Sequence, residues 1–98
     1  PGAKLDAGKM YADSILAGFS KALLAIVEVG TFGANKYSLH GWQDVEDGIR
    51  RYKDAAMRHK LKMDGGEVTD PESGLPHAYH YAWNVLAVLE LEQRQEED

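Results

Sequence analysis

The clearest periodic pattern in the chain begins at Leu75, where apolar residues recur at steps of four and three. These residues are Leu75, Tyr79, Ala82, Leu86 and Leu89. This spacing predicts an amphipathic helix with one apolar face. On the same helix His77, His80 and Asn84, here called the polar strip, fall within about 60° of one another at roughly 100° per residue. Burying such groups costs about 1 to 3 kcal/mol each without partners, so we expect the polar strip to meet hydrogen-bonding groups or a bound ion. The alternative is that His77 caps the first turn of the helix and His80 is a hydrogen-bonded core histidine.

Two more long helices are predicted upstream. The first runs from about Ser20 to Phe32, with Ser20 as its N-cap and with Phe19 and Leu24 as a hydrophobic staple. The second runs from about residue 45 to 63 and has one largely apolar side. That side carries Ile49, Tyr52, Ala56, His59 and Met63. Because Met57 and Leu61 lie on a different side, we expect this helix to be covered by a partner subunit as well as by its own domain.

The segments between these helices are rich in turn-forming residues. Residues 1–12 have no period and predict an extended arm, followed by a short turn of helix at 13–18. Glycines bound a loop at 33–42, and glycine and proline predict an acidic loop at 65–74. No repeat or linker divides the chain, and strand patterns are absent. We therefore expect one all-α domain over residues 1–98, a small bundle of three to four helices.

Composition narrows the class of partner. A net charge of −5 and a pI near 5.3 disfavour binding to a nucleic acid polymer or an anionic membrane. The chain has no cysteine, so a metal would have oxygen and imidazole ligands, which favours hard divalent ions. No apolar run is long enough to span a bilayer and no signal-like start is present, so we expect a cytoplasmic protein. A chain of 98 residues buries a modest core, which favours a homo-oligomer, a dimer or a tetramer.

Several side chains have the chemistry of a site. In the loop at 33–42, Lys36 can neutralise a phosphate, while Tyr37 and Trp42 either stack on a base or close the core. Asp54 either pairs with Arg58 at i, i+4 or joins the loop carboxylates around a cation, which leaves Arg58 for a phosphate.

Four ordered sequence blocks resemble one protein family. They are R-Y-K-D-A-A-M-R-H, then G-E-V-T-D-P-E-S-G-L-P-H-A-Y-H-Y-A-W-N, and towards the N-terminus G-A-K-L-D-A-G-K and F-G-A-N-K-Y…G-W. Together they resemble the phage dATP/dGTP diphosphohydrolase domain family. The resemblance implies a helical nucleotide pyrophosphohydrolase similar to the MazG-like group, which uses a divalent metal (Mg, Mn or Co) to cleave a purine deoxynucleoside triphosphate to the monophosphate and pyrophosphate. The E-E-x-x-E helix motif on which the wider group places its metal is absent here.

That activity implies roles for the candidate residues. Carboxylates and imidazoles would hold the metal and activate water. The leading catalytic residues and ligands are Asp54, Glu67 and His80, with Asp70, Glu72 and His77 as further metal ligands. Lys36 and Arg58 would neutralise phosphate charge, with Lys4 and Lys9 folding the arm over the triphosphate. Tyr37, Trp42 and Asn84 would stack on or read the base.

Two other functions stay open on the sequence alone. Helical His and Asp residues also suit an HD-type phosphohydrolase that releases triphosphate, although the adjacent H-D pair is missing. The third reading is a non-catalytic helical protein, an oligomerisation or nucleotide-binding module in which the polar strip forms a hydrogen-bonded core network.

Overall fold

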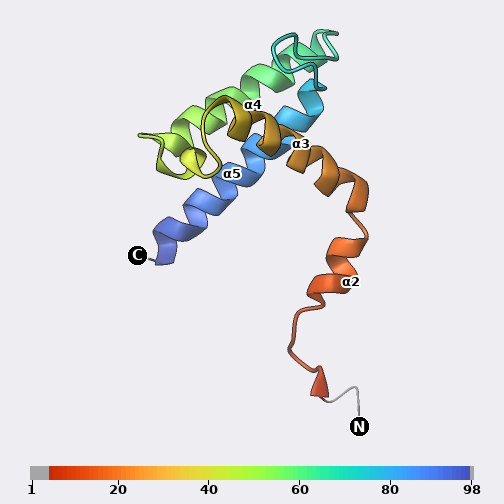
Figure 1. The fold of residues 1–98 in the computed structure, drawn as a ribbon. Coiled ribbons are helices and arrows are strands. Elements are labelled where there is room, and N and C mark those ends of the chain that lie inside the picture. Colours follow the sequence, from red (N-terminus) through yellow and green to blue (C-terminus); the bar gives the residue numbers. More distant parts are fainter. Residues whose placement is uncertain (1–4, 98) are drawn as a thin grey trace.

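The computed structural model describes residues 5–97 and contains α-helices joined by turns (Figure 1). Its elements are α2 (Ala12–Ala17), α3 (Ser20–Lys36), the 3-10 helix η1 (Gly41–Asp44), α4 (Gly48–Asp64) and α5 (His77–Glu97). Between residues 5 and 97 the only β-type pairing is one isolated bridge, between Thr69 and Pro76. The predicted all-α class is confirmed. No helix among these residues is long and apolar enough to cross a membrane.

The centre of the fold is the pairing of α4 with α5, and α3 packs across α5 (Figure 1). Few apolar side chains are fully buried there, namely Val29, Ala56, Ala87 and Val88. Small residues allow close approach: a Cβ added at Gly48 would lie 3.3 Å from the Leu91 side chain. An edge-to-face cluster of Trp42, Tyr52 and Trp83 holds η1 against α4 and α5.

The face that α5 buries differs from the sequence prediction. Leu86 and Leu89 of the predicted apolar stripe are 46% and 52% exposed, whereas His77, His80 and Asn84 are buried. The three-four spacing of the polar strip continues along α5 to Ala87 and Leu91, so these two apolar residues lie on the same side of the helix. Because α4 and the acidic loop both supply partners to the polar strip, the helix turns that side inwards and leaves Leu86 and Leu89 outside.

The first long helix also differs from its prediction. Ser20 is the first residue of α3 and not its N-cap; Phe19 holds the cap position without a side-chain cap bond. Phe19 and Leu24, the predicted staple, are both exposed. The helix runs on to Lys36, so much of the predicted loop at 33–42 is helical. A glycine in a helix costs only about 1 kcal/mol, and Gly30 lies against the Trp83 indole, so glycine does not end this helix.

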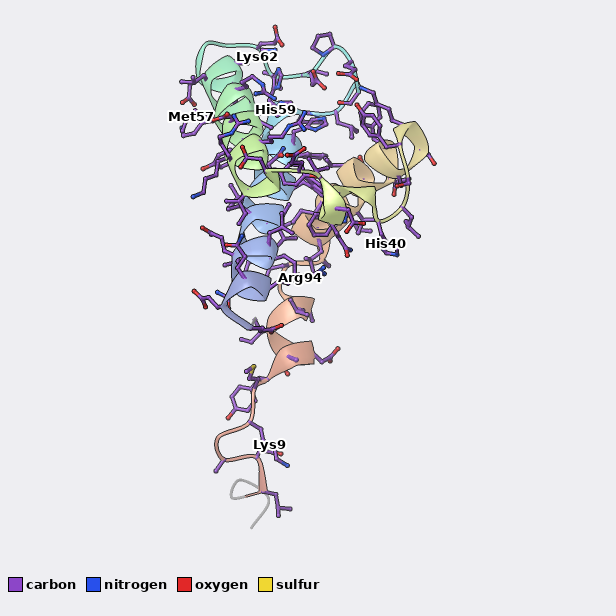
Figure 2. The ribbon with its side chains drawn as sticks, turned by 90° about the vertical axis from the view of Figure 1, so that its left-hand side faces the viewer. Lys9, His40, Met57, His59, Lys62 and Arg94 are labelled. Atoms are coloured by element: carbon purple, nitrogen blue, oxygen red, sulfur yellow. The ribbon has the colours of Figure 1, made fainter. Side chains whose placement is uncertain are left out.

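The other predicted elements are close to the observed ones. The short helix expected at 13–18 is α2, and α4 buries or half-buries every residue of its predicted inner side. The described part of the predicted arm, residues 5–11, leads away from the helices together with α2 (Figure 1). Figure 2 shows Lys9 at the far end of this extension. Lys4 lies outside the described residues.

A large apolar surface stays exposed on the single chain. It includes Ile15, Leu16, Phe19, Leu23, Leu24 and Val27 on or beside α2 and α3, Met57 and Leu61 on α4, and Val85, Leu86 and Leu89 on α5. Leu23, Leu24 and Val27 are neighbours at helical spacing on α3, and exposed apolar patches mark interaction surfaces. We propose that a second copy of the chain covers part of this surface, as the sequence predicted for Met57 and Leu61.

Substituting Leu24 tests this proposal. Leu24 is 64% exposed in the single chain, and burying a leucine contributes about 1.5 to 3 kcal/mol. Leu24→Asp is expected to weaken self-association by roughly tenfold to a hundredfold, measured by sedimentation over a range of concentrations. Lys21→Asp, which adds the same carboxylate at an exposed polar position of α3, should leave association unchanged. A wild-type chain that is monomeric at all concentrations would contradict the proposal.

Candidate active site

A cleft of about 710 Å³ opens between α3, η1, α4 and α5. This volume lies within the range of about 300 to 1,000 Å³ that is usual for small-molecule sites. One face of α4 lines it at helical spacing, with Arg51, Ala55, Arg58 and Lys62, and Tyr52 and His59 lie beside them. The end of α3 forms a second wall, and the start of α5 with part of the acidic loop forms a third. We call this space the cleft.

Four cations line the cleft of this acidic chain. They are Lys36 from α3 and Arg51, Arg58 and Lys62 from α4. Lys36 forms an ion pair with Glu72, which itself lines the cleft with Asp70. Lys36 and Arg58 were predicted from the sequence to neutralise phosphate charge, whereas Arg51 and Lys62 were not. The signal for them is their spacing from Arg58, seven before and four after on one predicted helix, which places all three on one face. The cleft therefore has the charge to bind a polyanion.

Aromatic rings form one end of the cleft. Trp42 and Trp83 pack edge to face with ring centroids 5.6 Å apart, and both line the cleft. The Tyr52 hydroxyl donates a hydrogen bond of 2.7 Å to the Trp42 carbonyl, which fixes η1 on α4. Trp42 thus closes the core, one of the two roles considered for it, and also lines the cleft. Tyr37 is 77% exposed, so it does not close the core. Trp83 was missed because its residue type on an apolar helix predicts core.

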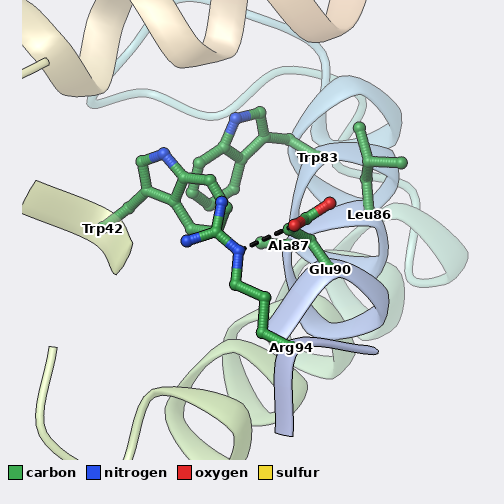
Figure 3. Close-up of a pocket in the computed structure, with 6 residues that line it drawn as sticks. All are labelled: Trp42, Trp83, Leu86, Ala87, Glu90 and Arg94. Carbon is green, nitrogen blue, oxygen red and sulfur yellow. Dashed lines mark hydrogen bonds and ion pairs between the residues drawn. The ribbon is translucent and has the colours of Figure 1, made fainter. Parts of the chain in front are cut away.

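The two indoles also wall a smaller pocket of about 290 Å³ on α5 (Figure 3). Arg94 lies there with its guanidinium carbon 6.0 Å from the Trp42 ring centroid. It also donates hydrogen bonds to Glu90 at 2.7 Å and to Gln43 of η1 at 3.0 Å. Arg94 therefore braces Trp42 within this smaller pocket.

Three histidines meet at the other end of the cleft, where α4 and α5 approach the acidic loop. The His59 and His80 rings are stacked, with centroids 4.5 Å apart and planes 9° from parallel. Nδ1 of His59 lies 2.8 Å from Nδ1 of His77, and Nε2 of His77 lies 2.8 Å from Oε1 of Glu67. Figure 2 shows His59 on α4 near this loop end of the molecule. His59, which the sequence placed on the largely apolar side of this helix, is half-buried and lines the cleft.

The acidic loop is folded by its own backbone. The Gly74 amide donates to the Asp70 carbonyl and the Asp70 amide to the Leu75 carbonyl, at 2.8 and 2.9 Å. Gly74 has φ of +75°, a conformation that glycine adopts without strain. The Asp70 carboxylate accepts a bond from the Ser73 amide at 3.3 Å and lies 3.5 Å from Nε2 of His80, which is 2.6 Å from the Ser73 hydroxyl. The turn thus places one carboxylate beside one imidazole of the cleft.

The electrostatics of this end follow from burial. The pKa of His59 is lowered to about 4, mainly by burial and next by the neighbouring His80, while Asp70 opposes the shift. Burial also lowers the pKa of His80, again against the effect of Asp70. For Asp70 itself burial acts to raise the pKa, but hydrogen bonds from Ser73 outweigh it and the pKa falls below its usual value. His59 and His80 are therefore held neutral beside an ionised carboxylate.

The structure does not bring together the leading trio of the sequence analysis. His80 lines the cleft, but Glu67 bonds to His77 and is not part of the cleft wall. Asp54 is five residues from His59, about 140° around α4 at roughly 100° per residue. It faces outwards and pairs with Arg50 at 3.0 Å, so the predicted pairing with Arg58 is replaced by one with Arg50.

The remaining predicted residues have clear positions. His77 is fully buried with both ring nitrogens hydrogen-bonded, so a metal there would have to displace Glu67 or His59. Asn84 lines the cleft, and its amide donates to the His80 carbonyl. Lys9 lies on the N-terminal extension, away from the cleft of its own chain (Figure 2). Within residues 5–97, no group of three or more His, Asp and Glu side chains is arranged to hold a metal ion.

The lowered pKa of His59 predicts a pH dependence of stability. Between pH 6.5 and about 4 the unfolded chain protonates this histidine and the folded chain does not, so acid favours unfolding. His59 therefore contributes stability above pH 6.5 that is lost as the pH falls towards about 4. We expect the thermal midpoint of His59→Gln to fall less steeply than that of the wild type over this range. His40→Gln, at an exposed histidine, should follow the wild type; identical slopes for all three proteins would contradict the prediction.

Comparison with known proteins agrees with the resemblance seen in the sequence. The family model described as "dATP/dGTP diphosphohydrolase, N-terminal" matches residues 1–98. A protein of Salmonella phage PMBT28 named dATP/dGTP diphosphohydrolase is 31% identical over 88 residues, which is 90% of this chain and 29% of that protein. The chain thus spans under a third of the length of this relative. No solved structure matches the chain. This chain belongs to the dATP/dGTP diphosphohydrolase N-terminal domain family.

Proposed function

We propose that this domain binds a purine deoxynucleoside triphosphate, dGTP or dATP, in the cleft and hydrolyses it to the monophosphate and pyrophosphate. The proposal rests on one observation: four cationic side chains and two indoles line the same cleft, in a chain whose net charge is −5. Membership of the family, and the name of the phage relative, support the choice of nucleotide.

The order of residues along α4 suggests how the nucleotide lies. Tyr52, at the indole end, and His59, at the loop end, are seven residues apart, which is about 10 Å along a helix. The base would stack at the indole end, where π-faces are available. The triphosphate would lie beside Arg58 and Lys62, near the histidines. Asn84 lines the same cleft and would contact the nucleotide between these ends.

A divalent metal enters this proposal with the substrate. Mg²⁺ is commonly held by one or two carboxylates together with substrate phosphates, and seldom by an all-protein cage. Asp70 and Glu72 are the carboxylates that line the cleft, so they would hold a Mg²⁺, Mn²⁺ or Co²⁺ ion bound to the triphosphate. Such an ion would neutralise phosphate charge and polarise a phosphoryl oxygen. This arrangement does not require three protein donors in one place.

The chain's own residues would then assist the hydrolysis. The oxygen of water bonds to the α-phosphorus, and one of its protons is taken up by a base in the cleft or by solvent. The bond from this phosphorus to the bridging oxygen breaks, and pyrophosphate leaves with that oxygen. Arg58 and Lys62 would stabilise the negative charge that develops on the phosphoryl oxygens. The stacked His59 and His80 rings would form the cleft wall beside the reacting phosphate.

The products of the reaction test the proposal. The chain is incubated with dGTP or dATP and with Mg²⁺, Mn²⁺ or Co²⁺, and the products are separated and identified. We expect deoxynucleoside monophosphate and pyrophosphate. Release of tripolyphosphate and nucleoside would instead support the HD-type alternative.

A second candidate is nucleotide binding without hydrolysis. The observation that favours it is the satisfied hydrogen bonding of His77, whose two ring nitrogens are used by Glu67 and His59. Quenching of Trp42 and Trp83 fluorescence by dGTP, with no product under any metal, would support this candidate and contradict catalysis.

Arg58→Gln tests the role of the basic face. Hydrogen bonds to charged groups contribute about 1.5 to 3 kcal/mol, so we expect kcat/KM to fall by roughly ten- to a hundredfold. Arg50→Gln is the matched control, because Arg50 is on the same helix but pairs with Asp47 and Asp54 on the outer side. An Arg58→Gln enzyme with wild-type kcat/KM would show that triphosphate does not bind at this face.

A further inference from the structure

Glu67, His77 and His59 form a chain of hydrogen bonds whose direction can be worked out. A carboxylate only accepts hydrogen bonds, so Nε2 of His77, 2.8 Å from Glu67, carries the hydrogen. In a neutral ring the other nitrogen is then an acceptor. Nδ1 of His77 lies 2.8 Å from Nδ1 of His59, and therefore Nδ1 of His59 carries a hydrogen and donates it. His59 is left with a bare Nε2.

The bare nitrogen of His59 is accessible to solvent. The structure gives Nε2 of His59 no hydrogen-bond partner among residues 5–97. Every buried side-chain nitrogen or oxygen in the described part of the chain has a partner, so this Nε2 cannot be buried. His59 lines the cleft, and stacking on His80 at 4.5 Å fixes the plane of its ring. The lone pair of Nε2 therefore has a set direction and an open side.

We propose that Glu67 and His77 hold His59 in the tautomer whose Nε2 accepts a hydrogen bond from water in the cleft, and that this is the water that attacks the triphosphate. The inference rests on the proposed function and adds a residue to it: His59 is a catalytic residue, and Glu67 and His77 are positioning residues that act through it. The opposite tautomer would present an N–H, which binds a phosphate oxygen and cannot accept from water.

The buried position of His77 explains why this device needs three residues. Glu67 is half-exposed on the acidic loop and reaches His77, which is fully buried between α4 and α5. Because Glu67 only accepts a hydrogen bond from Nε2 of His77, Nδ1 of His77 is an acceptor in turn, and His59 on α4 must donate to it. Its tautomer is fixed by the hydrogen bond that its other nitrogen makes, the general way in which histidine orientation is set.

The tautomers can be measured without substrate. Nitrogen-15 spectra of the histidine-labelled protein above pH 7 distinguish N–H from bare ring nitrogens. We expect His59 to carry its hydrogen on Nδ1 and His77 on Nε2. A hydrogen on Nε2 of His59, or a doubly protonated His77, would overturn the proposal.

Glu67→Gln tests whether Glu67 sets the direction of the hydrogen bonds between His59, His77 and residue 67. An amide can either donate or accept, so we expect His77 and His59 to populate both tautomers in this variant. Glu67 is half-exposed, so the fold should tolerate the change. Asp64→Asn is the matched control, since Asp64 pairs with Lys60 at 2.8 Å outside this hydrogen-bond chain. In this control, His59 and His77 should have the same tautomers as in the wild type. Unchanged tautomers in Glu67→Gln would overturn the role of Glu67.

Kinetics separate this inference from the proposed function. His59→Leu is expected to lower kcat by about a hundredfold or more, the scale of a lost proton acceptor, with KM within about threefold of the wild type. His59→Gln, whose amide oxygen can accept, should recover part of the loss. Equal loss in both variants, or a change confined to KM, would overturn the inference while the proposed function stands. A wild-type chain without turnover would refute the proposed function and, with it, the role of His59 towards the attacking water.

Discussion

The pairing of α4 with α5 depends on burying polar side chains, and each buried polar group needs a partner. His77, His80 and Asn84 occupy the inner face of α5 that leucines would fill in an ordinary helical pair. Their partners come from His59 on α4, from Glu67 and Ser73 on the acidic loop, and from the backbone of α5 itself. An unpaired member would cost about 1 to 3 kcal/mol, a large share of the stability of a domain this small. The acidic loop therefore contributes to the core as well as connecting α4 to α5.

Much of the fold follows from the sequence because helical periodicity is local. The helix α4 was predicted to within three residues at its start and one at its end, its apolar side with Ile49 and Ala56 and the acidic loop were predicted, and the family resemblance is confirmed. The inner face of α5 was predicted only in part. The polar strip was expected to meet hydrogen-bonding groups and does so, but Leu86 and Leu89 were expected on a buried face and are exposed. A periodic pattern assigns leucine to the interior, and this rule fails when residues distant in the chain supply partners to a polar face.

The residues of the candidate site, too, were predicted only in part. Lys36, Trp42, Arg58, Asp70, Glu72, His80 and Asn84 were selected from the sequence and line the cleft, as does Tyr37. Asp54 was selected as a leading ligand, but the register of α4 places it about 140° from His59 at roughly 100° per residue. A carboxylate near a histidine in a helical sequence is thus not near it in space unless the spacing is three, four or seven. Arg51 and Lys62 meet that spacing with Arg58, and the same rule would have found them.

The ion pair between Lys36 and Glu72 shows how a cleft with both signs of charge can suit a metal-bound triphosphate. Without a ligand, this pair neutralises two of the charged groups that line the cleft. Under the proposed function, the phosphates would take the place of Glu72 beside Lys36, and the freed carboxylate would join Asp70 on the accompanying cation. Lys36 then exchanges a carboxylate for a phosphate, and Glu72 exchanges an ammonium group for the metal cation. Binding would thus avoid the cost of burying an unpaired charge, and a preformed metal cage is not needed for the cleft to discriminate a metal-bound triphosphate from the bare anion.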